Sequence, residues 1–247
     1  MKNLIVANWK MNPVSQKEAK NIFEEIKREI KGTKSEVIIC PPFVYLSPLK
    51  GPGLGAQDCF YEEKGAFTGE TSAPMLKDLG VEYAIIGHSE RRKYFGETDE
   101  IVNKKIKKAL EVGLKVIFCI GETQEQHGPK GYPGEKNKVL ENQIKQGLAG
   151  IFNLQSLILN LAVAYEPVWA IGTGNNCSIE ETKQSIEFIR ETLVLSGVEG
   201  QVRVLYGGSV KSENSGAYIK DAGANGLLVG GASLNPEEFV KIVKSAE

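Results

Sequence analysis

The stretch L-A-V-A-Y-E-P-V-W-A-I-G-T-G, residues 161–174, joins an apolar run to a loop through a single carboxylate. Residues 161–165 are typical of a buried strand, and Pro167 cannot donate to a sheet ladder, so the strand is expected to stop before it. Glu166 therefore stands at the end of a buried strand, where a carboxylate is a candidate base. Pro167 is stiff and Gly172 is permissive, which suits a hinged lid over residues 167–174. A capping or ion-paired Glu166 fits this spacing about as well.

Similar apolar runs recur along the chain, separated by longer charged segments. Two of the separators have the pattern of amphipathic helices: residues 15–31 and residues 178–196 each begin with a Ser-x-x-Glu capping box. Strands that are apolar throughout and alternate with such helices predict a parallel sheet covered on both faces. The number of units in this length favours a closed (β/α)₈ barrel over an open doubly wound sheet. The runs are residues 4–7, 37–40, 54–56, 83–86, 116–120, 161–165, 202–206 and 227–229.

The composition is that of an ordinary globular protein. Hydrophobic residues make up 41% and charged residues 25% of the 247 positions, and the formal net charge is -1, so a general attraction to nucleic acid is not favoured. No linker or low-complexity tract divides the chain, so we expect one domain over residues 1–247. The apolar run at residues 4–7 is too short for a signal peptide and no segment is long enough to cross a membrane. The expected location is the cytoplasm.

Cysteine and histidine spacing indicates neither a disulfide framework nor a metal site. The four cysteines form no C-x-x-C pair, and His88 and His127 are not spaced as ligands of one ion. Cys40 and Cys119 each end an apolar run, where a buried structural thiol is the expected state. We therefore expect no bound metal and no cofactor.

The residues that follow each predicted strand form a chemically coherent set. In a (β/α)₈ barrel the carboxyl ends of the strands build the active site. A base, a histidine and glycine-rich turns suited to an anion converge there. These positions are Asn8 and Lys10 after the first strand, His88 and Glu90 after the fourth, Glu166 after the sixth, Ser209 after the seventh, and Gly230 and Gly231 after the eighth.

Six blocks of sequence together resemble the triosephosphate isomerase family. The blocks are N-W-K at 8–10, G-A-F-T-G-E at 65–70, G-H-S-E-R-R at 87–92, A-Y-E-P-V-W-A-I-G-T-G at 164–174, Y-G-G-S-V at 206–210 and L-V-G-G-A-S-L at 228–234. They cover essentially the full chain in the right order. The resemblance implies interconversion of dihydroxyacetone phosphate and glyceraldehyde 3-phosphate through an enediol or enediolate, without a redox cofactor or metal.

The resemblance also implies roles for individual residues. Glu166 corresponds to the family's base, His88 to the group that polarises the carbonyl, and Lys10 to its electrostatic residue. A helix that begins just after His88 would favour a neutral imidazole. Asn8 is the expected orienting neighbour of Lys10. Glu90 resembles a carboxylate near Lys10, although a salt bridge at a helix start is nearly as plausible.

Phosphate binding and closure are implied for a second group of residues. Gly172, Ser209, Gly230 and Gly231 match the family's phosphate contacts, where glycine permits close approach of backbone amides. Ile171 and Leu228 correspond to an apolar cover over the base. Glu122 and Tyr206 correspond to residues that contact the lid, although packing or capping would also explain them. The lid itself comprises Pro167, Val168, Trp169, Ala170, Ile171, Gly172, Thr173 and Gly174.

Thr68 resembles the tip of a loop that enters a neighbouring subunit, so a homodimer is expected. Two features depart from the family pattern: Asp58 follows Gln57 where Asn is more usual, and the loop at residues 124–134 is longer and richer in Gly and Pro. His127 lies in that loop and is expected to be exposed to solvent. Arg91 and Arg92 are expected to be structural.

Two other functions remain open at this level. A different barrel enzyme acting on phosphorylated sugars, such as a Schiff-base aldolase, would need a lysine at a mid-barrel strand end, where Glu166 stands instead. A non-catalytic phosphate-binding barrel or interaction protein would be indicated by loss of the base or of His88, and both are present.

Overall fold

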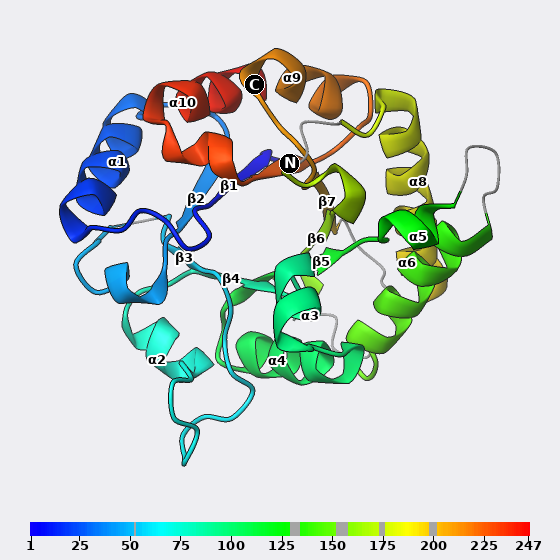
Figure 1. Ribbon diagram of the computed structural model, residues 1–247, viewed down its shortest axis with the longest axis horizontal. Helices are drawn as coiled ribbons and strands as arrows, with labels where there is room; N and C mark the ends of the chain where they lie inside the picture. The colour runs from blue at the N-terminus through cyan, green and yellow to red at the C-terminus, as the bar shows by residue number, and fades with distance from the viewer. Residues whose placement is uncertain (52, 129–133, 152–157, 173–175, 198–201) are drawn as a thin grey trace.

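Eight parallel strands form the centre of the molecule and helices surround them (Figure 1). The computed structural model describes residues 1–51, 53–128, 134–151, 158–172, 176–197 and 202–247. The strand order is β2-β1-β8-β7-β6-β5-β4-β3, and every paired neighbour is parallel. The two end strands meet through a bridge between Ile39 and Leu54, where the Ile39 N–H donates to the Gly53 carbonyl at 2.8 Å. This contact closes the barrel, and the predicted (β/α)₈ fold is confirmed.

The strands lie within two residues of the apolar runs read from the sequence. The third is the shortest, because Leu54 pairs only through the isolated bridge. The strands are β1 Leu4–Asn8, β2 Glu36–Cys40, β3 Gly55–Ala56, β4 Tyr83–Ile86, β5 Lys115–Ile120, β6 Leu161–Tyr165, β7 Arg203–Tyr206 and β8 Gly226–Val229.

The α-helices follow the strands in chain order. They are α1 Gln16–Glu29, α2 Ala73–Asp78, α3 Ser89–Phe95, α4 Asp99–Glu111, α5 Gln124–His127, α6 Gly134–Gly147, α8 Ile179–Leu195, α9 Ser212–Lys220 and α10 Pro236–Ser245. Short 3₁₀ turns occur at η1 Phe43–Tyr45, η2 Val168–Ala170 and η3 Gly231–Leu234. The predicted helix starts are observed, since Ser15, Ser178 and Asn235 each accept a hydrogen bond from the backbone three residues on.

Alternating side chains along each strand fill two separate spaces. One set points into the barrel and packs as a dry core, which includes Val6, Ile85 and Leu205. The other set points outward against the helices, which explains why the strands are apolar throughout. Cys40 and Cys119 belong to the inner set, so they are buried as predicted, and burial raises the pKa of both thiols.

Charged side chains cover the amino-terminal end of the barrel. Glu36 accepts hydrogen bonds from Arg203 at 2.6 Å and from the Tyr83 hydroxyl at 2.7 Å, while Lys115 lies 3.2 Å away. Arg203 also donates to the Tyr83 oxygen at 2.7 Å. Hydrogen bonds from Tyr83 and Arg203 hold the pKa of Glu36 below its usual value although partial burial opposes them. The cluster joins four strands at the end opposite the candidate site.

Within the ranges that the structure describes, no helix is long and apolar enough to cross a membrane.

Candidate active site

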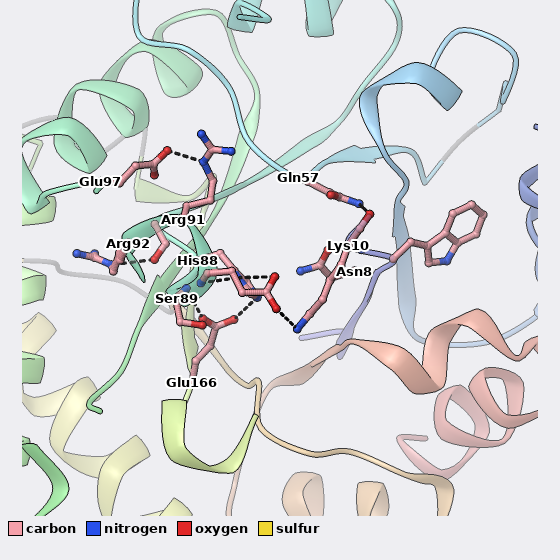
Figure 2. Close-up of polar contacts among 12 residues, drawn as sticks. Asn8, Lys10, Gln57, His88, Ser89, Arg91, Arg92, Glu97 and Glu166 are labelled. Carbon is pink, nitrogen blue, oxygen red and sulfur yellow. Dashed lines mark hydrogen bonds and ion pairs between the residues drawn. The ribbon is translucent and has the colours of Figure 1, made fainter. Parts of the chain in front are cut away.

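Glu166 lies directly after β6 at the carboxyl end of the barrel, and its carboxylate is buried, with 2% of the side chain exposed. One oxygen lies 3.2 Å from His88 Nε2 and the other accepts the Ser89 N–H at 3.2 Å (Figure 2). Gly121 packs against the backbone here: a Cβ at Gly121 would lie 1.7 Å from the Glu166 carbonyl oxygen. The ends of β4, β5 and β6 thus hold the buried carboxylate against a histidine.

The hydrogen bonds of His88 define its tautomer. The ring is buried at the N-cap of α3, and its Nδ1 accepts the Glu90 N–H at 3.2 Å. A nitrogen that accepts carries no proton, so in the neutral ring the hydrogen sits on Nε2 and points toward Glu166. The helix start was predicted from the sequence and is confirmed. His88 can therefore donate one hydrogen bond into the site.

Lys10 has a left-handed backbone conformation, with φ of 53°, which is unfavourable for a residue with a side chain. Two side chains hold it there. The Lys10 N–H donates to Asn8 Oδ1 at 3.1 Å, and the Gln57 amide donates to the Lys10 carbonyl at 2.8 Å (Figure 2). The Lys10 ammonium lies 2.6 Å from Glu90 Oε1. Asn8 and Glu90 thus contact Lys10 as the sequence suggested.

Gln57 holds the backbone of Lys10, a contact that the sequence did not predict. It follows β3 directly, and its amide also donates to the Cys40 carbonyl at 2.9 Å, so it joins the ends of the second and third strands to Lys10. Its position after a predicted strand was a usable signal.

A cavity of about 720 Å³ opens at the carboxyl ends of the strands and brings the candidate residues together. Lys10, His88 and Glu166 lie at one part of its lining. The glycine-rich turns after β7 and β8 line the same cavity, and η3 starts there, so its first amides lack partners within the turn. All four candidate anion contacts, Gly172, Ser209, Gly230 and Gly231, line the same cavity, as do Ile171 and Leu228.

Hydrogen bonds join residues 168–170, just after Glu166, to the residues that follow β5 and β7. The Val168 N–H donates to the Glu122 carbonyl at 3.0 Å, and the Trp169 indole donates to Glu122 Oε1 at 2.9 Å. The Ser209 hydroxyl donates to the Ala170 carbonyl at 2.6 Å. Glu122 thus contacts this segment, as the resemblance implied. Thr173 and Gly174 of the predicted lid lie outside the described residues.

The prediction that His127 is exposed to solvent is wrong. Only 19% of its side chain is accessible, because its ring packs against Trp169 with centroids 4.7 Å apart. Its Nδ1 lies 3.1 Å from Glu122 Oε1 and its Nε2 lies 3.3 Å from Glu181 Oε1. Residues 124–127 form α5, which turns the histidine back toward the barrel; residues 129–133 lie outside the described residues.

Arg91 and Arg92 make structural contacts, as expected. Arg92 pairs with Asp99 at 2.6 Å, and Arg91 pairs with Glu97 and with Asp58. Asp58 and Glu97 are buried and also bind the buried Lys105, at 2.6 Å and 2.5 Å. The cluster lies beside the site rather than in the cavity.

The loop containing Thr68 projects from the body of the molecule (Figure 1). Its base is closed by the Phe60 N–H, which donates to the Thr71 carbonyl at 2.8 Å, and residues 62–70 are all exposed.

Comparisons with known proteins agree with this geometry. A family model described as triosephosphate isomerase matches residues 3–246. The chain is 46% identical to the triosephosphate isomerase of Aquifex aeolicus over 253 aligned positions, which cover 99% of this chain and all of that protein. It is 47% identical to that of Carboxydothermus hydrogenoformans over 257 positions, with 99% of each chain covered. The residues that converge at the barrel mouth thus occur in a chain that belongs to the triosephosphate isomerase family.

Proposed function

We propose that the protein interconverts dihydroxyacetone phosphate and D-glyceraldehyde 3-phosphate, a step of glycolysis and gluconeogenesis. The observation that carries the proposal is the approach of a buried carboxylate, Glu166, to a histidine that presents an N–H, with Lys10 and a glycine-rich anion site on the same cavity. The reaction moves a proton between adjacent carbons and leaves the oxidation level of the whole molecule unchanged. It therefore needs no external oxidant or reductant.

Glu166 acts as the base. Its carboxylate removes a proton from the carbon next to the substrate carbonyl, which leaves an enediolate, and then returns a proton to the neighbouring carbon. A carboxylate in water is a weak base. Glu166 is buried, and the exclusion of water strengthens the electrostatic interaction between its carboxylate and the proton that it removes.

His88 and Lys10 stabilise the charge that develops on the substrate oxygens. The Nε2–H of His88 donates to the carbonyl oxygen as it gains negative charge, and the same ring can pass a proton between the two oxygens. The Lys10 side chain lines the same cavity and adds a positive charge, and the hydrogen bonds with Asn8 and Gln57 fix the backbone of Lys10 in advance. Such preorganisation means that no reorientation is needed during the reaction.

The phosphate binds away from the base, at the turns formed by Ser209, Gly230 and Gly231 together with Gly172. This separation keeps the phosphate charge from opposing a second anion at the enediolate. Residues 167–174 form the lid, and Ile171 with Leu228 provides its apolar cover. The binding of phosphate by a lid residue couples recognition of the substrate to exclusion of water.

Exposed apolar side chains support a homodimer formed through the loop containing Thr68. Met11 and Val14 are 90% and 93% exposed, Phe67 lies in the loop itself, and Phe95 is exposed at the end of α3. Such side chains near one end of a barrel are typical of an association surface. Association there would brace the segment that carries Lys10. We further propose that the enzyme acts in the cytoplasm as one domain, with triose phosphate as its partner and no nucleic acid or membrane partner.

The test is a coupled isomerase assay on glyceraldehyde 3-phosphate with the wild type and Glu166→Gln. The substitution removes the base with little change of volume, so kcat should fall by about 100-fold or more. Glu213→Gln changes an exposed carboxylate at the rim of the same cavity and should leave kcat close to the wild-type value. Unchanged turnover in Glu166→Gln would refute the assignment, and a folded wild type without activity would favour a barrel that only binds phosphate.

A further inference from the structure

His127 connects two carboxylates on different elements. Its Nδ1 lies 3.1 Å from Glu122, which follows β5, and its Nε2 lies 3.3 Å from Glu181, in the first turn of α8. Lys136 of α6 lies 3.5 Å from the same Glu181 oxygen, and the Trp169 ring packs on the imidazole. These are the charged and aromatic groups that face the ring.

Both ring nitrogens can donate only when the imidazole is charged. A neutral ring has one N–H and one lone pair, so it can serve one carboxylate and must present its lone pair to the other. The imidazolium satisfies both at once. Histidine is the side chain that changes charge in the pH range where enzymes are commonly assayed.

Glu122 depends on a compensating charge because none of its side chain is exposed. Its Oε1 accepts hydrogen bonds from the Trp169 indole at 2.9 Å and from the Tyr165 hydroxyl at 3.2 Å. Its Oε2 is buried, and the structure gives this atom no partner among the residues it describes. Within the same ranges, no Lys or Arg pairs with Glu122, so His127 is the neighbour there that can carry a compensating charge. A buried carboxylate that loses its cationic partner is strongly destabilised in place.

We propose that His127 is a positioning residue for the Trp169 side chain: as an imidazolium it holds the Glu122 carboxylate where the indole N–H binds it, and loss of that charge loosens this contact. The inference rests on the proposed function only in assigning Trp169 to the lid. The link itself consists of the contacts of His127 and Trp169 with Glu122, and it can be tested without substrate. It makes the attachment of residues 168–170 sensitive to pH.

The indole N–H of Trp169 reports directly on the proposed link. The chain has two tryptophans, so ¹⁵N-tryptophan labelling of the ligand-free protein gives two indole signals, and Trp169→Phe identifies the one from Trp169. The buried Trp9 serves as an internal control for the fold. In the wild type, the Trp169 indole proton shift should move between a low-pH and a high-pH plateau, with the downfield plateau at low pH because the proposed link holds the hydrogen bond there.

Variants at position 127 separate the charge from the ring. His127→Gln should remain at the high-pH plateau throughout, and His127→Arg, with a permanent charge, at the low-pH plateau throughout. Glu125→Gln, an exposed carboxylate on the same α5, should keep the wild-type step. A pH step that persists in His127→Gln, or an Arg variant that follows the Gln variant, overturns the proposal. Because no turnover is measured, a failed isomerase assay would leave this result interpretable on its own.

Discussion

Asp58→Asn is expected to stabilise the protein above pH 6. Asp58 is almost fully buried beside Lys105 and Arg91, and burial raises the pKa of its carboxyl from 3.8 to about 6, with the nearby Glu97 carboxylate acting in the same direction. Lys105 and Arg91 lower the pKa, but not enough to offset burial. Asn has nearly the shape of the protonated acid, so the substitution removes the cost of holding an anion there.

The size of the effect follows from linkage. A carboxyl whose pKa is about 2 units higher in the folded state than in the unfolded chain binds its proton more tightly when folded. The free energy of unfolding is therefore highest below about pH 4, where the carboxyl is protonated in both states. It falls as the pH rises toward 6 and stays lower by a constant amount above that. Two units correspond to about 3 kcal/mol. Asp58→Asn should therefore gain up to about 3 kcal/mol at pH 8 and about half of that at pH 5.

The measurement is equilibrium unfolding in urea at pH 5, 6, 7 and 8, with wild type and variants at one protein concentration because association would shift the apparent stability. Asp99→Asn is the matched control. Asp99 is partly exposed and paired with Arg92, so its substitution should give no gain at any pH. If Asp58→Asn lowers the free energy of unfolding at pH 8, attraction to Lys105 and Arg91 outweighs burial and the reasoning is wrong.

Three further substitutions test how the site and the barrel are built. Gly121→Ala forces a methyl group against the Glu166 carbonyl, so kcat should fall at least about tenfold while circular dichroism shows a folded barrel; unimpaired turnover would contradict the packing argument. Gln57→Leu removes the donor to the Lys10 carbonyl and should lower kcat more than it raises KM; a change confined to KM would argue against positioning. Tyr83→Phe removes the hydroxyl that donates to Glu36 and accepts from Arg203 at the amino end of the barrel. It should lower the free energy of unfolding in urea by about 1–2 kcal/mol without changing kcat.

The repeating pattern in the sequence determined the fold and the end of the barrel at which the chemistry lies. Apolar runs at regular spacing can bury themselves only as a parallel sheet covered by helices, so the pattern alone puts Glu166 and His88 at strand ends. The capped helix starts, such as the one at Ser178, followed from local hydrogen bonding. These properties depend on residues close together in the chain.

Only the tertiary structure decided which side chains far apart in the sequence form ion pairs and hydrogen bonds with one another. His127 is polar and follows a strand within a Gly-rich stretch, which predicts exposure, yet the fold places it between Glu122 and Glu181, two carboxylates 59 positions apart. The clamp of Gln57 on Lys10 crosses 47 positions in the same way. Sequence spacing can place such a residue at a strand end but does not say which side chain it contacts, because these contacts arise where separate strands and helices meet. The sequence of residues 161–174 thus indicated the base, Glu166, and the fold showed that Glu122 and Ser209 hold residues 168–170 in place.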